Sequence, residues 1–191
     1  MRRIILASAS PRRKQLLEQV GLKFDIEVSD FHEVLDNTIP PHDLAKQLSI
    51  GKAQTVAKNH TDALIISADT IVILDGQVLG KPQNDDDARR ILHMLSGKPH
   101  TVITGFTILE VSSGKIYTDS IATTVYFKTL TPEQINAYVA TGYSLDKAGG
   151  YGIQEKESNF VERIDGDYWN VVGLPIDAVV KALRKFGVKI V

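Results

Sequence analysis

Residues 63–74 read Ala-Leu-Ile-Ile-Ser-Ala-Asp-Thr-Ile-Val-Ile-Leu, and this run decides the fold class. A nearly continuous apolar and β-branched run of this kind predicts a strand buried on both faces of a sheet. Asp75-Gly76 follows and favours a two-residue turn, so Val78-Leu79 is expected to fold back beside the strand. Asp69 lies inside the run, where an ionised carboxylate is costly unless a cation, a metal ion or hydrogen bonds compensate its charge. Asp69 is therefore the leading candidate for a catalytic or metal-binding residue, ahead of a structural role.

The other segments alternate between strand and helix patterns. Strand candidates at 100–111 and 115–128 are joined by Ser112-Ser113-Gly114, which predicts a hairpin. Asp165-Gly166 predicts a second hairpin, between strands at 159–164 and 168–172. Long hairpins interspersed with helices indicate an α/β protein with a mixed sheet. Further strands are predicted at 4–6 and 24–28, and helices at 11–20, 42–58, 84–95, 131–142 and 175–186.

Composition excludes several classes of protein. The chain has 191 residues, 43% of them hydrophobic and 24% charged, which predicts one soluble domain. A net charge of −1 gives no electrostatic basis for binding a nucleic-acid polymer or a membrane surface. The chain contains no cysteine, so disulfides and thiolate catalysis are excluded. The apolar stretch near the N-terminus is far too short for a signal peptide or a membrane span, and a cytoplasmic location is expected.

The predicted helix at residue 11 carries charges that oppose its own dipole. Ser10 is a favourable N-cap, and Pro11 suits the first helical position. Arg12, Arg13 and Lys14 then occupy the first turn, where acidic residues are normally preferred. Free backbone N–H groups, serine hydroxyls and guanidinium groups together suit a phosphate. The alternative at this point is a solvated basic turn.

Three further charged residues are candidates for the same site. Lys52 falls in the middle of an apolar helical stripe, so its side chain either extends to solvent, pairs with an anion or points into a cavity. Glu33 lies in an acidic loop at 29–41, which either faces a site or is simply solvated. Lys81 follows the predicted hairpin, which would return it toward Asp69. Its surroundings do not form a phosphate-binding Walker loop, because no Ser or Thr follows it.

The cationic and acidic candidates together indicate phosphoryl-transfer chemistry. Cations hold phosphates, and carboxylates hold a divalent ion such as Mg²⁺ or Mn²⁺ through oxygen. The five histidines lack the spacing of zinc ligands, and the nucleophile elbow of a serine hydrolase is absent. An aspartate-nucleophile phosphatase would need a second carboxylate two residues after Asp69, where Ile71 stands. The cationic set is Arg12, Arg13, Lys52 and Lys81, and the acidic set is Glu33 and Asp69.

Taken together, these residues resemble the Maf family of nucleoside triphosphate pyrophosphatases, also described as septum-formation inhibitors. The resemblance covers essentially the whole chain and rests on several separated motifs in one order. Such an ordered set makes a chance match very improbable. The motifs are 7–13, Glu33, Lys52, 67–72, 80–82, 146–154 and 172–175.

The resemblance implies metal-dependent hydrolysis of a nucleoside triphosphate to the monophosphate and pyrophosphate, with Mg²⁺ or Mn²⁺ as cofactor. It implies that Asp69 is the general base and that Glu33 and Asp69 hold the metal. Residues 146–154 are similar to the branch that cleaves dTTP and UTP, with modified pyrimidine nucleotides as further expected substrates, rather than to the branch acting on 7-methyl-GTP. The resemblance further implies that the phosphates are bound by Ser8, Arg13, Lys52 and Lys81. It implies that the choice of substrate depends on Arg12, Thr70 and Gln154.

The fold implied by the resemblance is elongated and α/β, like that of inosine triphosphate pyrophosphatases. Residues 1–191 would form one domain with a cleft between two lobes, and a homodimer is expected. The sequence departs from the family pattern at Gly150, where alanine is common, and at 155–158, which replace a glycine-containing continuation. A nucleotide-binding regulator of cell division without turnover is the alternative function. Two carboxylates beside four cations argue against it, because binding alone does not require them.

Overall fold

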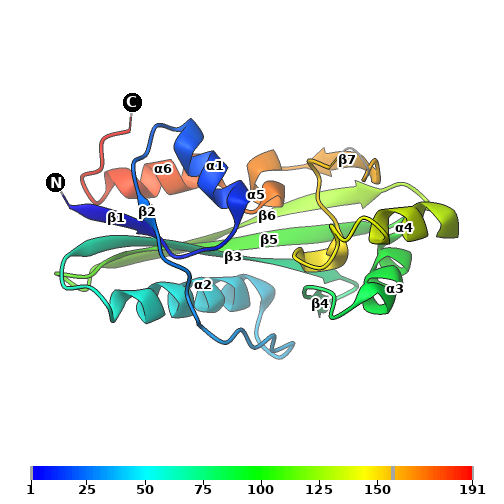
Figure 1. The fold of residues 1–191 in the computed structure, drawn as a ribbon, viewed down its shortest axis with the longest axis horizontal. Helices are drawn as coiled ribbons and strands as arrows, with labels where there is room; N and C mark the ends of the chain where they lie inside the picture. The colour runs from blue at the N-terminus through cyan, green and yellow to red at the C-terminus, as the bar shows by residue number, and fades with distance from the viewer. Residues whose placement is uncertain (1, 156–157, 191) are drawn as a thin grey trace.

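One mixed sheet runs the length of the molecule (Figure 1). The computed structural model describes residues 2–155 and 158–190, and in them seven strands form this sheet, in the order β2-β1-β3-β5-β6-β7, with β4 paired to β3. The sheet is parallel where β1 meets β2 and β3, and antiparallel elsewhere. The strands are β1 (Arg3–Leu6), β2 (Asp25–Ile26), β3 (Ala63–Leu74), β4 (Gln77–Leu79), β5 (Pro99–Glu110), β6 (Ile116–Phe127) and β7 (Val161–Asp165).

β3 connects the two ends of the sheet. Its first four residues pair with β1, its last three residues pair with β4 across the turn at Asp75-Gly76, and β5 pairs along most of its length. Asp75 has a φ of 50° and Gly76 a φ of 82°, the left-handed values that this type of hairpin turn requires. The buried strand and the hairpin predicted from 63–79 are therefore confirmed.

Helices cover both faces of the sheet. α2 lies along one face, α1, α5 and α6 lie on the other, and α3 and α4 pack together at the far end of the long strands (Figure 1). No helix in the described part of the chain is long and apolar enough to cross a membrane. The helices are α1 (Pro11–Gln19), α2 (Pro41–Ala57), α3 (Asp85–Leu95), α4 (Pro132–Val139), α5 (Tyr168–Val172) and α6 (Ile176–Arg184), with a 3₁₀ turn at Ala148–Gly150.

Two predicted strands are wrong in whole or in part. Residues 168–172 form helix α5 rather than a strand, because the Asp167 side chain caps this segment by accepting hydrogen bonds from the N–H groups of Trp169 and Asn170. β7 therefore pairs with β6 instead of forming a hairpin. The strand predicted at 24–28 is reduced to the two residues of β2.

α2 approaches the sheet closely at Gly105, and this contact positions the middle of β3. Gly105 is the cross-strand partner of Asp69. A Cβ at residue 105 would lie within 2.7 Å of three backbone atoms, the carbonyl O and C of Ala45 and the N of Lys46. Backbone atoms of a packed helix cannot move aside as the tip of a side chain can. The absence of a side chain at residue 105 therefore allows α2 to lie this close to the sheet.

We expect Gly105→Ala to lower the free energy of unfolding by about 1–3 kcal/mol, because the added methyl group forces α2 away from the sheet. Urea unfolding followed by far-ultraviolet circular dichroism measures the change. A Gly105→Ala protein as stable as the wild type would show that α2 does not depend on this approach.

Candidate active site

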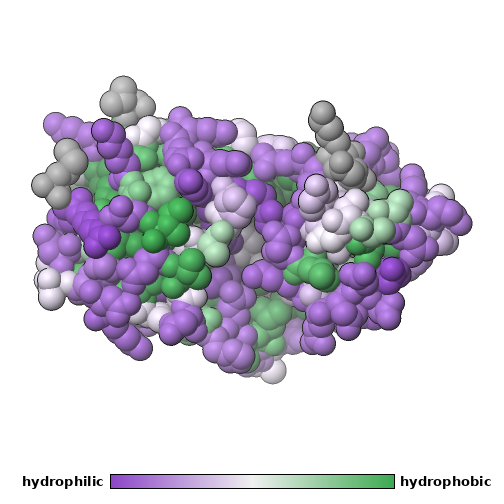
Figure 2. All heavy atoms as spheres, in the orientation of Figure 1, coloured by the Kyte–Doolittle hydropathy of each residue, from purple (hydrophilic) through white to green (hydrophobic). Residues whose placement is uncertain are grey.

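A cleft of about 470 Å³ contains every residue proposed for the site from sequence. Its walls come from the β1–α1 turn, the loop before α2, the middle of β3, the segment after β4 and the loop before β7. The surface is hollowed near the middle of the face shown in Figure 2. The residues proposed from sequence that line the cleft are Ser8, Arg12, Arg13, Glu33, Lys52, Asp69, Thr70, Lys81 and Gln154.

Asp69 and Lys52 form a buried ion pair at the base of the cleft. Asp69 is 5% exposed and Lys52 9% exposed, and the Lys52 ammonium donates a hydrogen bond to Asp69 Oδ1. The same ammonium lies 2.7 Å from Glu33 Oε1. Of the three interpretations of Lys52, pairing with an anion is thus confirmed, and Lys52 holds two carboxylates together.

The two carboxylates differ in their electrostatics. Burial raises the pKa of Asp69 above its ordinary value, against the attraction of Lys52 and with the repulsion of Glu33. Burial also acts to raise the pKa of Glu33, but Lys52, together with Lys81 and Arg13, outweighs it and lowers that pKa. Neighbouring carboxylates with pKa values shifted in opposite directions are typical of acid–base sites.

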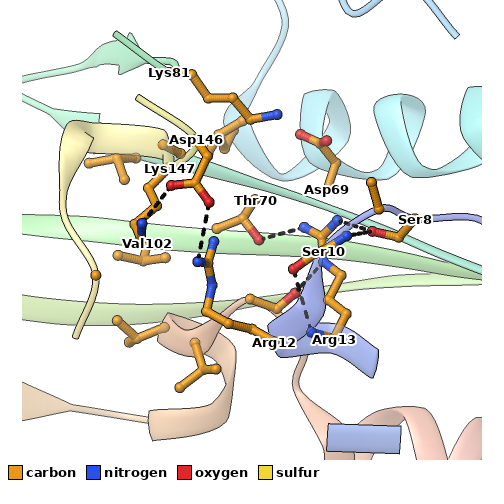
Figure 3. A pocket seen from close by; sticks show the side chains of 18 of the residues that line it. Ser8, Ser10, Arg12, Arg13, Asp69, Thr70, Lys81, Val102, Asp146 and Lys147 are labelled. Carbon is orange, nitrogen blue, oxygen red and sulfur yellow. Dashed lines mark hydrogen bonds and ion pairs between the residues drawn. The ribbon is translucent and has the colours of Figure 1, made fainter. Parts of the chain in front are cut away.

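Arg13 connects three walls of the cleft (Figure 3). Its Nε donates to the Gly173 carbonyl at 2.8 Å, and its two terminal nitrogens donate to Ser8 Oγ at 3.2 Å and Thr70 Oγ1 at 3.1 Å. Burial lowers the pKa of this guanidinium, although the nearby Asp69 opposes the change. A guanidinium has five N–H donors, so two remain for a ligand after these three bonds.

The basic first turn of α1 divides between the cleft and the surface. Arg12 and Arg13 line the cleft, whereas Lys14 pairs with Glu18 on the exposed side of the helix at 3.7 Å. Ser10 is the N-cap, as predicted, and its Oγ accepts from the Arg13 N–H. The solvated interpretation therefore holds for Lys14 alone, and the positive end of the helix dipole faces the cleft.

An ion pair that the sequence did not predict crosses the cleft from Arg12. The Arg12 guanidinium lies 3.6 Å from Asp146, whose carboxylate accepts a hydrogen bond from Lys147 at 2.5 Å (Figure 3). Lys147 is itself buried and pairs with Glu155 at 2.8 Å. The sequence singles out Asp146 and Lys147 only as members of the motif at 146–154, and Arg12 and Asp146 lie too far apart in the chain for spacing to predict their pairing.

The glycine-rich loop is pinned against β3 and β4. Gly149 has a φ of 71° and donates its N–H to the Gly80 carbonyl at 3.0 Å, and a Cβ there would lie 2.9 Å from Val72. Gly150 has a φ of 72°, a left-handed conformation that glycine adopts without strain, which accounts for glycine at this departure from the family pattern. Of the second departure, the Glu155 carboxylate accepts a hydrogen bond from the Tyr138 hydroxyl of α4, Ser158 donates to the Glu155 carbonyl at 3.0 Å, and Lys156 and Glu157 lie outside the described residues.

His100, on β5, anchors the same loop through Tyr151. It is 3% exposed, its Nε2 lies 2.7 Å from the Tyr151 hydroxyl, and its ring packs edge-on against Phe127 and Tyr151. Burial lowers the pKa of His100 to about 4, so the ring is neutral at pH 7. Tyr151 is followed at once by the cleft-lining residues 152–154.

The carboxylates fit a small divalent cation. Asp69 and Glu33 each engage Lys52 through one oxygen, and within residues 2–155 and 158–190 their second oxygens have no hydrogen-bond donor. Carboxylate oxygen is the ligand that Mg²⁺ and Mn²⁺ prefer, and Mg²⁺ is commonly held by one or two carboxylates with substrate phosphates completing its shell. No group of three or more His, Cys, Asp or Glu side chains that could hold a metal ion occurs in the described part of the chain.

Comparisons with known proteins identify relatives of the chain and its fold. The family model described as Maf-like protein matches residues 3–186. A dTTP/UTP pyrophosphatase of Alkaliphilus metalliredigens (strain QYMF) is 50% identical over 186 residues, covering 97% of this chain and 96% of that one. A dTTP/UTP pyrophosphatase of Desulforamulus reducens is 49% identical over the whole of both chains. The solved structure of the Staphylococcus aureus Ham1 protein covers 97% of this chain and 100% of its own at a TM-score of 0.53 and 12% identity, which confirms the fold class alone.

The buried His100 predicts a specific dependence of stability on pH. Its pKa is about 4 when folded against about 6.5 when unfolded, so between these values the unfolded state binds more protons, and stability falls as pH is lowered. We expect up to about 1.4 kcal/mol of loss per pH unit, and about 3 kcal/mol in all. Unfolding by urea from pH 7 to pH 4 measures it, with His100→Gln lacking this component. Parallel pH profiles for the two proteins would contradict a neutral buried His100.

Proposed function

This chain belongs to the Maf-like protein family, and we propose that it is a pyrophosphatase that hydrolyses dTTP and UTP to the monophosphate and pyrophosphate. The relatives with that activity in their names are 47–50% identical over almost the whole chain. The observation that carries the proposal is the ion-paired set of Asp69, Lys52 and Glu33 in a cleft that is also lined by four other cationic side chains. A triphosphate supplies the negative charge that this cleft would neutralise.

The phosphates would bind between the first turn of α1 and Lys81. The dipole of α1, the two remaining donors of Arg13 and the Arg12 guanidinium favour an anion on one side. Lys81 lines the opposite wall and has no ion-pair partner among the described residues. These cations would hold the β- and γ-phosphates as the leaving pyrophosphate.

Asp69 would act as the general base. It takes a proton from a water molecule as that water attacks a phosphorus of the anhydride between the α- and β-phosphates, and the bridging P–O bond breaks. Its raised pKa brings it nearer to the operating pH, and Lys52 fixes the orientation of its other oxygen. Glu33 and Asp69 would hold Mg²⁺ or Mn²⁺, which when bound would neutralise phosphate charge and polarise the attacked phosphoryl group.

Recognition of the pyrimidine is assigned to Arg12, Thr70 and Gln154. Gln154 is exposed at the mouth of the cleft, and its amide offers both a donor and an acceptor to a pyrimidine edge. The Thr70 hydroxyl already bonds to Arg13 and lies 2.9 Å from Thr104 Oγ1, so it would act mainly by fixing that wall. Modified pyrimidine nucleotides, a homodimer and a cytoplasmic location stay predictions.

A regulator that binds nucleotides without turnover is the second candidate. Incubation of the protein with Mg²⁺ or Mn²⁺ and a panel of ordinary and modified nucleoside triphosphates separates the two. Pyrophosphate as the first product supports the enzyme, tight binding without product supports the regulator, and orthophosphate as the first product would indicate a phosphatase.

Asp69→Asn should reduce kcat for dTTP at least about a hundredfold while the protein stays folded, because asparagine keeps the shape but cannot accept the proton. Pyrophosphate release measures the rate, and circular dichroism reports the fold. Asp165→Asn, an exposed carboxylate on β7, is the control and should keep the wild-type rate. Wild-type turnover by Asp69→Asn would exclude Asp69 as the base.

Lys81→Ala should raise KM for dTTP about tenfold and change inhibition by TMP much less, because the lost charge would face the β- and γ-phosphates. Lys23→Ala, an exposed lysine outside the cleft, is the matched control. Equal losses for the triphosphate and the monophosphate would mean that Lys81 does not contact the departing end.

A further inference from the structure

Gly51 stands in the interior of α2, where glycine weakens a helix relative to alanine. Its backbone is not left-handed, so conformation does not require glycine at this position. A Cβ at residue 51 would lie within 2.8 Å of three atoms, Cζ, Cε2 and Cε1 of the Phe31 ring. The three nearest atoms all belong to this one ring, so making room for Phe31 is the structural reason for glycine here.

The Phe31 ring holds one side of the loop that carries Glu33. Phe31 packs against the apolar cluster between α2 and the sheet, which includes Leu44 and Leu48. Glu33 is two residues further along the chain, and its partner Lys52 is the residue after Gly51. The segment from β2 to α2 passes beside α2, as Figure 1 shows.

A second, weaker contact holds the other side of the same loop. A Cβ at Gly80 would lie 2.5 Å from Leu35 Cδ1, the tip of a flexible side chain that can move aside. Phe31 and Leu35 thus flank Glu33 on either side. The contact between the Phe31 ring and Gly51 is the stricter of the two. Three atoms of the ring lie within 2.8 Å of the Cβ position at residue 51, and a ring can move only as a rigid unit.

We propose that Gly51 is a positioning residue for the pyrophosphatase reaction. Resting on the proposed function, the inference is that the missing side chain at residue 51 seats the Phe31 ring and thereby sets Glu33 at 2.7 Å from Lys52. The glycine costs helix stability and sets the geometry of the carboxylate pair. A role in helix packing alone predicts that alanine leaves turnover unchanged, whatever its effect on helix stability.

Gly51→Ala separates these two roles. We expect its melting temperature to equal or exceed that of the wild type, its kcat for dTTP to fall about tenfold, and amide hydrogen exchange to speed up in residues 29–38 with exchange in α2 unchanged. Gln54→Ala, on the exposed face of the same helix, is the matched control and should leave both kcat and loop exchange unchanged. Wild-type kcat or wild-type loop exchange in Gly51→Ala would overturn the proposal.

A double-mutant cycle tests whether Gly51 acts through the ring. Phe31→Ala should lower kcat and speed loop exchange as Gly51→Ala does, and the double variant should be no worse than Phe31→Ala alone. If the double variant instead lost kcat by the product of the two single-variant factors, the two residues would act independently, and the proposal would be overturned. A wild-type protein that releases no pyrophosphate contradicts the proposed function itself, whereas the exchange measurement tests the seat of Phe31 without reference to activity.

Discussion

The structure depends on the burial of one carboxylate in its central strand. Asp69 is 5% exposed in β3, and an ionised group there is tolerated only because Lys52 reaches it from α2. That ion pair requires α2 to lie close to the sheet, which Gly105 allows by having no side chain against Ala45. The same lysine then gathers Glu33 from the neighbouring loop. A hydrophobic pair would serve stability at least as well, so the charged set is best understood as a chemical requirement.

Around this set, the cleft is assembled from segments that are distant in sequence. Arg13 bonds the first turn of α1 to β3 and to Gly173 at the end of α5, and Asp146 pairs with Arg12 from the glycine-rich loop. Most of these bonds are made by charged or hydroxyl groups to single, directed partners. Such a network fixes the walls before a ligand arrives, which is what preorganised electrostatic catalysis needs.

Sequence patterns predicted the elements that local chemistry determines. The apolar run of β3, the turn at Asp75-Gly76 and the N-cap of α1 at Ser10 are all confirmed. Residues 168–172 were mistaken for a strand because their apolar content concealed the cap at Asp167. Misplaced charge on apolar elements drew attention to Asp69 and Lys52, whereas Ser8, Thr70 and Gln154 were proposed from the family resemblance. The contacts that support the site were not predicted. His100 with Tyr151 and Phe31 with Gly51 are examples, because the spacing of these residues in the sequence gives no sign that they meet.

The central claim is that Asp69 and Glu33 face the phosphates of a bound nucleotide, and a crystal structure with a non-hydrolysable dTTP analogue and Mn²⁺ tests it most directly. The account predicts an anomalous manganese peak on oxygens of Asp69 and Glu33, with the α- and β-phosphates beside it and Lys81 at the far end of the triphosphate. A triphosphate bound elsewhere, or manganese away from both carboxylates, would contradict it.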